Sequence, residues 1–257
     1  MKSILTSFAV IAFGALALIV TSCSKSNIAV DTAPINPFDF VGQMHNAGLQ
    51  SVLDGLATTK AEQDLSAVEA EINRLSVEFC ESVFNNDPRF EISSFTKSGT
   101  IGLPEVQMDT TIGDIATEYL NRIAFVLESD DCAEIASGLL SIESDILSPD
   151  ASQLSEYERT YLLCCLSVGR YSSDFWKEYP QTKAASAKYA IGAIVGADLW
   201  GAGEGIFAHG PEILICGVIG GPGCGLAAAA RAALVPAITK SAFAGFCAGC
   251  GYLAETL

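Results

Sequence analysis

The sequence predicts an all-α protein, in which an antiparallel helical bundle is followed by a Gly/Ala-rich helical tail that carries a glycine zipper. Two observations predict this fold. Apolar residues in the middle of the chain recur every three or four positions, which is the spacing of one helix face. Toward the C-terminus, glycines recur four apart around the uncharged stretch ILICGVIGGPGCGLAAAA (residues 213–230). Residues four apart share a helix face, so these glycines form a groove where another helix can pack closely.

The first 22 residues have the pattern of an export signal. Lys2 precedes an uncharged apolar run, and the small residues Thr21 and Ser22 lead to Cys23. The run is long enough to span a bilayer, so a retained anchor helix is the alternative. V-T-S-C resembles the lipobox of bacterial lipoproteins, where the cysteine is lipidated and becomes the new N-terminus. We therefore expect residues 1–22 to be a lipoprotein signal peptide and Cys23 to be the lipidation site.

Residues 23–36 are expected to form a lipidated tether, because they are small and polar and include Pro34. Acyl chains contribute about 0.8 kcal/mol per buried methylene, so more than one chain on Cys23 gives stable anchoring. The expected location is the bacterial cell envelope, as an exported lipoprotein anchored in the outer membrane.

The bundle domain is expected over residues 37–180, where four apolar stripes have helical spacing. The stripes are Leu49, Val52, Leu53 and Leu56; Val68, Ile72, Leu75, Phe79 and Val83; Ile135, Leu139, Ile142 and Ile146; and Tyr157, Tyr161, Cys165, Val168, Ser172 and Phe175. They indicate an antiparallel bundle of about five helices. The pattern is weaker over residues 89–104, where a short strand and a loop both remain open.

Helix starts and stops agree with the stripes. Capping-box spacing, in which two side chains satisfy free N–H groups of the first turn, occurs at Thr59 with Glu62, Asp131 with Glu134, and Ser155 with Glu158. Stop signals follow at Asn85-Asn86-Asp87-Pro88, at Ser148-Pro149-Asp150 and at Tyr179-Pro180.

Two segments resemble uncharacterised exported lipoproteins of Bacteroidota. The first is NPFDFVGQMHNAGL (residues 36–49), with an Asn-Pro-aromatic-acidic-aromatic entry before a helix. The second is LSEYERTYLLCCLSVGRYSSDFW (residues 154–176), and a Gly/Ala-rich tail follows it. The resemblance covers roughly half of the chain after the signal peptide and implies this localisation and layout. It implies no activity and no catalytic residue.

Charge and cysteine content narrow the function classes. Lys and Arg number 14 against 30 Asp and Glu, a formal net charge of −16, and no basic stripe occurs, so nucleic-acid binding is excluded. Of nine cysteines, those left after Cys23 are even in number, in a compartment where disulfides persist. The alternative is that several are small buried hydrophobic residues.

His45 is the one polar residue in the bundle that suggests chemistry. As a general base it needs a partner, and only Asp39 and Asp54 are near in sequence, with no nucleophile motif. We favour a structural role, in which Asn46 caps a helix and His45 fixes the entry of the chain. Six aromatic residues either belong to the core, which we favour, or line a ligand groove: Tyr157, Tyr161, Tyr171, Phe175, Trp176 and Tyr179.

Sequence motifs of enzymes and metal sites are absent or incomplete. Gly201, Gly203 and Gly205 lack the final glycine of a dinucleotide fingerprint, and no strand is expected before them. Four tail cysteines offer zinc ligands only at unsuitable spacing: Cys216, Cys224, Cys247 and Cys250. The C-x-x-C pair lacks the βαβ context of a redox motif. We expect no catalytic residue, no metal and no cofactor.

The tail is expected over residues 181–257, as helices near 186–205, 212–234 and 238–254. The glycines expected to line its helix-packing or membrane face are Gly192, Gly196, Gly217, Gly221, Gly225, Gly245 and Gly249. A hairpin at Gly221-Pro222-Gly223 would bring Cys216 and Cys224 within the roughly 4.4–6.8 Å Cα separation of a disulfide.

Two functions remain open for the tail. Interior glycine costs roughly 1 kcal/mol relative to alanine in water, whereas close helix packing favours it in lipid. The zipper is similar to the tails of two-peptide bacteriocins, which implies membrane association or insertion and a bacteriocin-like or pore-type activity. Alternatively, the tail packs on the bundle as helical core, and the protein is a non-enzymatic structural or interaction module of the envelope. The expected partner is membrane lipid, through Cys23 and, on the first interpretation, through the tail; no protein partner is indicated.

Overall fold

The computed structural model describes residues 35–57, 65–86, 111–178, 190–210, 212–213 and 222–250. All regular structure in these residues is helical, with seven α-helices and one short 3-10 turn, η2 (Pro149–Ala151), and no strand. Five α-helices precede residue 180: α2 (Asp39–Ala57), α3 (Leu65–Asn86), α5 (Asp114–Val126), α6 (Cys132–Leu147) and α7 (Glu156–Glu178). Two follow it: α8 (Ala190–Ala208) and α10 (Pro222–Cys250). The all-α prediction is confirmed for this part of the chain.

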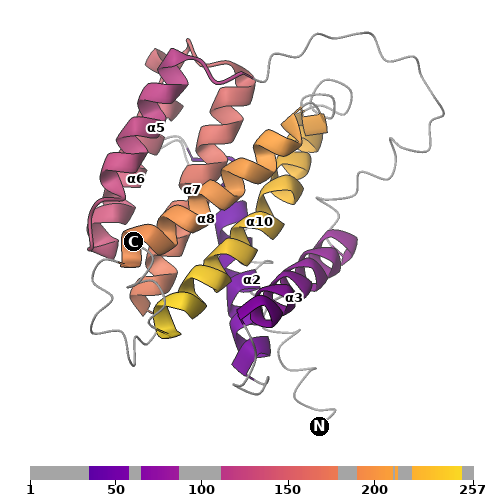
Figure 1. Cartoon of the computed structure of the whole chain (residues 1–257). Coiled ribbons are helices and arrows are strands. Elements are labelled where there is room, and N and C mark those ends of the chain that lie inside the picture. The colour runs from indigo at the N-terminus through magenta and orange to yellow at the C-terminus, as the bar shows by residue number, and fades with distance from the viewer. Residues whose placement is uncertain are drawn as a thin grey trace, which may run out of the picture. The chain divides into compact units, whose positions relative to one another are not determined.

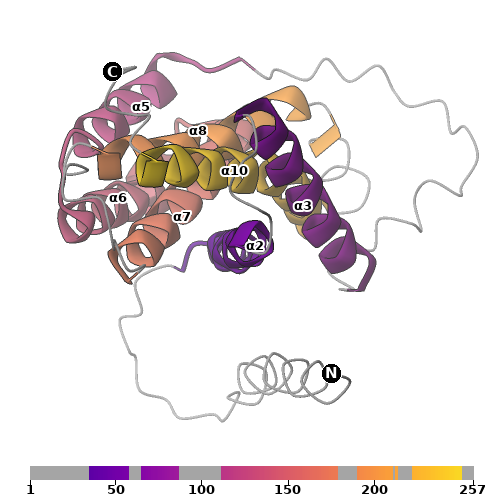
Figure 2. The same ribbon diagram turned by 60° about the horizontal axis from the view of Figure 1, so that its bottom comes forward.

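Contacts divide the chain into two compact units, Met1–Ala33 and Pro34–Leu257. The first unit holds the expected signal peptide and Cys23, and it lies outside the described residues. Within the second unit, α7 packs against α2, α6 and α8, while α10 packs against α8, α2 and α3 (Figures 1 and 2). The two tail helices therefore belong to the same compact unit as the five helices before them.

Local side chains cap the first turns of two helices before residue 180. Ser155 Oγ accepts from the N–H of Glu158 at 3.2 Å, and Glu158 Oε2 accepts from the N–H of Ser155 at 2.8 Å, so this capping box is confirmed. Asp131 caps α6, but the Glu134 carboxylate accepts from the Ser129 hydroxyl instead of from Asp131. That reciprocal half of the prediction is wrong. The Thr59 and Glu62 pair lies outside the described residues, as do residues 89–104.

The chain enters the helices at Asn36, and not at His45 and Asn46 as expected. Because α2 starts at Asp39, both of those residues lie inside it. Asn36 Oδ1 accepts from the N–H of Phe38 at 2.9 Å, and Asn36 Nδ2 donates to Leu163 O at 2.9 Å. The buried side-chain amide of Asn36 thus forms hydrogen bonds both to the residue before α2 and to α7.

All four apolar stripes lie inward. Every described member is buried or half-buried, and fully buried examples are Leu49, Ile72, Ile135 and Leu139. Among the six aromatic residues, Tyr157, Tyr161 and Trp176 are buried core, whereas Tyr179 lies outside the described residues.

The expected break in the tail between residues 234 and 238 is wrong, because α10 continues through Pro236. Proline has no N–H, so the carbonyl of Ala232 loses its helical donor, at a cost of about 3 kcal/mol or more in an isolated helix. That carbonyl faces Gly205 of α8 so closely that a Cβ on Gly205 would clash with it. The proline therefore lies where α8 and α10 approach each other closely. Residue 222, the proline of the expected hairpin, is instead the first residue of α10, where its fixed φ favours the helix.

Candidate functional site

Four fully buried polar side chains meet at the junction of four helices. They are His45 of α2, Ser172 of α7, Asp198 of α8 and Ser241 of α10. Burying an ionisable side chain costs free energy unless it is paired or neutral. Such a cluster is the strongest candidate for a functional site in the described part of the chain.

Asp198 is the centre of the cluster. The Ser172 hydroxyl donates to Asp198 Oδ2, and His45 Nε2 lies 3.9 Å from the same oxygen. On its other side, His45 Nδ1 lies 3.1 Å from Asn46 Oδ1, and Asn46 Nδ2 donates to Tyr171 O at 2.7 Å. If Nδ1 carries the proton, Nε2 is a free acceptor facing the carboxyl group, and it has no hydrogen-bond partner among the described residues.

Burial makes both members of the pair neutral. Loss of solvation raises the pKa of Asp198 to about 8, although the polar hydrogens of Ser172, Ser241 and Trp176 oppose the rise. Loss of solvation also lowers the pKa of His45 to about 4. Near pH 7 the cluster therefore holds a carboxylic acid beside a neutral imidazole, and not an ion pair.

The geometry does not match a Ser-His-Asp triad. In a triad the serine hydroxyl bonds to histidine, whereas Ser172 donates to Asp198. His45, Ser172 and Asp198 are also fully enclosed, so no substrate reaches them without opening the helices. Near pH 7 the Asp198 carboxyl group therefore keeps its own proton beside His45.

Sequence reasoning considered the wrong partners for His45. Asp54 accepts from Gln50, and Asp39 pairs with Arg170, which also contacts Glu143 at 3.4 Å. The neighbour of His45 in the structure is Asp198, which lies far from it in the sequence. An acidic residue in the middle of an otherwise apolar helix was the available signal, because such a residue must find a partner.

The zipper glycines have different surroundings. Added Cβ atoms would clash with the Leu127 carbonyl at Gly192 and with the Trp176 ring at Gly245, but would make ordinary contact at Gly196. Gly225 lies near the start of α10, and Gly249 near its end. Gly217 and Gly221 lie outside the described residues. Gly201 and Gly205 lie against backbone atoms of Ala232, Pro236 and Ala237 of α10.

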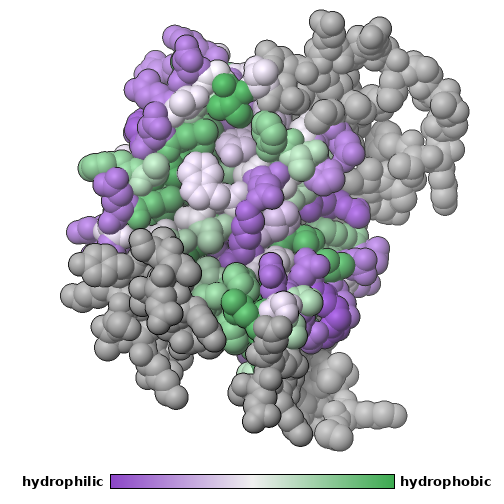
Figure 3. Space-filling model, viewed as in Figure 1, coloured by the Kyte–Doolittle hydropathy of each residue, from purple (hydrophilic) through white to green (hydrophobic). Residues whose placement is uncertain are grey.

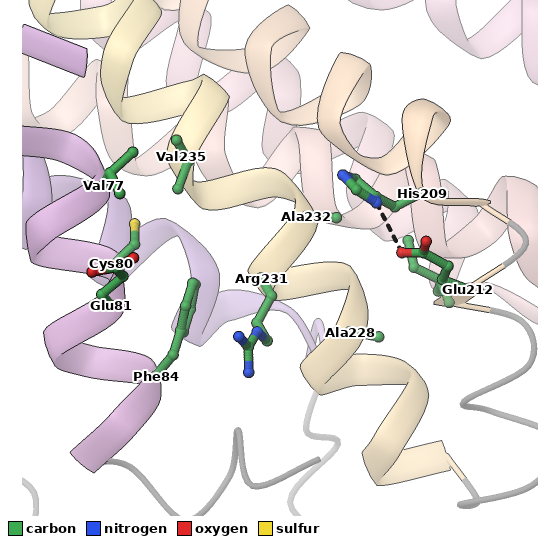
Figure 4. A pocket seen from close by; sticks show the side chains of 11 residues that line it. Val77, Cys80, Glu81, Phe84, His209, Glu212, Ala228, Arg231, Ala232 and Val235 are labelled. Atoms are coloured by element: carbon green, nitrogen blue, oxygen red, sulfur yellow. Dashed lines mark hydrogen bonds and ion pairs between the residues drawn. The ribbon is translucent and has the colours of Figure 1, made fainter. Parts of the chain in front are cut away.

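A surface pocket of about 470 Å³ lies between α3, the end of α8 and α10. Figure 4 shows the Arg231 guanidinium beside the Phe84 ring, 4.8 Å from its centre, with His209 and Glu212 paired across the pocket. Apolar side chains line the rest, including Val77 and Val235. Charges of both signs on an apolar floor suit a small amphipathic molecule. Sequence reasoning missed this pocket because its walls come from distant segments.

The expected disulfide is unsupported. Cys224 is a free thiol, and Cys216 lies outside the described residues. Cys80, Cys164 and Cys165 are buried free thiols, and burial raises the pKa of the Cys80 thiol to about 12, which leaves it unreactive. No cluster suitable for a metal ion occurs among the described residues.

Two described segments are long and apolar enough to cross a membrane, Ile191–Ala208 in α8 and Gly223–Cys247 in α10. Core helices of soluble proteins pass the same test, and 67% of the first segment and 50% of the second are buried inside the protein. Length and composition are therefore compatible with membrane association and do not distinguish it from core packing.

Comparison with known proteins found no matching family model, no matching curated protein and no matching solved structure.

Proposed function

We propose that the protein is an exported lipoprotein of the bacterial cell envelope, anchored in the outer membrane through acylated Cys23. Its role is non-enzymatic, as an interaction module whose tail is helical core. The resemblance to lipoproteins of Bacteroidota and the V-T-S-C sequence support the anchor. The packing of the tail supports the rest.

One observation carries the proposal for the tail: backbone atoms of α10 lie against the face of α8 that carries Gly201 and Gly205. A Cβ on Gly201 would lie 2.8 Å from Pro236 O and 2.9 Å from Ala237 Cα. A zipper occupied in this way has no room on that face for a helix of another molecule.

The contacts of α10 with α2, α3 and α7 support the same conclusion. Ile238 is fully buried against Gly48 and Phe79, and Gly245 packs on the Trp176 ring. Removing α8 and α10 would expose apolar side chains of the bundle, at roughly 25 cal/mol per Å² of apolar surface. A bundle without its tail should therefore be incompletely folded.

Truncation after Pro180 tests this proposal. We expect the truncated chain to aggregate or to lose cooperative thermal unfolding in circular dichroism, whereas a matched control ending at Cys250 should unfold cooperatively. A truncated chain that folds and stays monomeric would contradict the assignment of the tail to the core.

Insertion of the tail into a membrane is the second candidate, favoured by the length and apolar composition of α8 and α10. It would give bacteriocin-like or pore-type activity, and it requires the tail to leave the bundle. Leakage of dye from liposomes by the full chain, combined with a truncated chain that folds, would support it over the first proposal.

The anchor is tested separately. Cys23→Ala should abolish labelling by a fatty-acid probe and block cleavage after Ser22, while Cys224→Ala should leave both unchanged. Normal labelling of the Cys23 variant would remove the lipoprotein assignment.

A further inference from the structure

The outward face of α8 is aromatic and nearly uncharged. On this helix Ala193, Ala197, Trp200, Glu204 and Phe207 follow one another at helical spacing, and all are at least partly exposed. Trp200 is 38% exposed and Phe207 61% exposed. Figure 3 shows green and near-white surface over much of α8, interrupted by purple side chains.

The charge on this face is compensated. Glu204 pairs with Lys240 of α10, so the only acidic side chain of the stripe has a cationic partner. On α10, Pro236, Lys240 and Phe243 share one side, because they are four and three residues apart, and both Pro236 and Phe243 are partly exposed. A locally neutral apolar face is unusual on a chain with a formal net charge of −16.

We propose that this face, defined by Trp200, Phe207, Phe243 and the Glu204–Lys240 pair, docks on the surface of a bilayer with zwitterionic headgroups. Tryptophan favours the boundary between headgroups and acyl chains, because its ring is apolar and its indole N–H remains hydrated. Phenylalanine adds apolar surface on the side of a helix that lies in this boundary. The acidic remainder of the chain disfavours an anionic bilayer.

The inference rests on the proposed anchor at Cys23 and adds the surface that meets the membrane. Residues 23–34, even fully extended, span at most roughly 40 Å, so an acylated chain holds the helices close to its own bilayer. The tether thus gives the helices a high effective concentration at the membrane surface. Under this condition, one weakly apolar face is enough for contact with the bilayer. Docking leaves α8 folded against α10, unlike insertion.

The chain contains only two tryptophans, and they report different events. Trp200 lies on the proposed face, whereas Trp176 is 5% exposed and packs under Gly245. The experiment reconstitutes the native acylated protein in phosphatidylcholine vesicles with brominated acyl chains, which quench nearby indoles. Trp176→Phe isolates Trp200, and the difference between wild type and Trp200→Phe gives the same signal without altering the core.

Docking predicts that bromolipid quenches most of the Trp200 emission and shifts it to shorter wavelength, while Trp176 emission is unchanged. Adding anionic phosphatidylglycerol should reduce the quenching. Protein that floats with the vesicles but shows unquenched Trp200 overturns the docking face and leaves the anchor intact. Quenching of both tryptophans also overturns it, in favour of insertion. Failure to float contradicts the anchor itself.

Discussion

Gly55 in the bundle and the pair Gly201 and Gly205 in the tail allow helices to approach in different ways. In α2, an added Cβ at Gly55 would meet side-chain carbons of Leu75, the nearest at 2.9 Å. In α8, an added Cβ at Gly201 or Gly205 would meet backbone atoms of α10. A side chain can change rotamer, whereas the backbone of a packed helix moves only with its neighbours. Gly55 should therefore tolerate a small substitution that Gly201 and Gly205 do not.

The largest effect is expected at the contact between tail backbones. Gly205→Ala forces a methyl group into the Ala232 carbonyl, so we expect a loss of about 3 kcal/mol, at the upper end for overpacking. Thermal unfolding measures it. The matched control is Gly223→Ala in the first turn of α10, where no atom lies within 4 Å of the added Cβ. That variant should gain roughly 0.5–1 kcal/mol because alanine restricts the unfolded chain. Equal melting temperatures for the two variants would contradict the close backbone contact.

The buried pair that joins bundle to tail should give an unusual dependence of stability on pH. Asp198 keeps its proton in the folded state up to pH of about 8, but loses it near pH 4 when unfolded, so its contribution falls as pH rises between these values. His45 stays neutral down to pH of about 4, but protonates near 6.5 when unfolded, so its contribution falls as pH drops through that range. Between about pH 4 and 6.5 the two slopes cancel.

Above pH 6.5 only the Asp198 slope remains, and it lowers the free energy of unfolding by on the order of 2 kcal/mol by pH 8. Asp198→Asn removes that slope and leaves the His45 slope, so its stability should rise from pH 4 to 6.5 and then level off. Melting temperatures of the wild type and Asp198→Asn across pH 4–8 measure both curves. Parallel curves would show that Asp198 titrates normally in the folded protein.

The smallest effect is expected in the bundle. Gly55→Ala gains about 1 kcal/mol of helix propensity, and the flexible end of Leu75 must shift by a few tenths of an ångström. These contributions nearly cancel, so the melting temperature of Gly55→Ala should be close to that of the wild type. Its change should be smaller than the change caused by Gly205→Ala. A loss as large as that of Gly205→Ala would remove the distinction between the two regions.

Local signals allowed several helices before residue 180 to be predicted. The Ser155–Glu158 box and the stripe through Ile135 and Ile146 are properties of one helix, and the structure confirms them. The errors arose where distant residues decide the outcome. Pro236 stops an isolated helix, but α10 continues through it where α8 lies close. The neighbour of His45 is Asp198, which no local spacing indicates.

The tail shows why small-residue sequences are harder to interpret. In α8 and α10 most residues are apolar whichever way they face, so the sequence contains no apolar stripe that would mark the buried face. Contact between backbones depends on which helix approaches, and that information lies outside the segment. The disulfide prediction failed to gain support for a similar reason. Cys224 is a free thiol, and an even number of cysteines does not determine which of them lie close enough to pair.

The position of α10 after α2 and α3 in the sequence has a consequence for how the chain folds during synthesis. Synthesis on the ribosome runs from the N-terminus, so α2 and α3 are made before α10, whose Ile238 packs against Gly48 and Phe79. Contacts of such high sequence separation form late and slowly. Until the 29 residues of α10 are made, the apolar side chains that it covers stay exposed, and the incomplete chain is prone to aggregate.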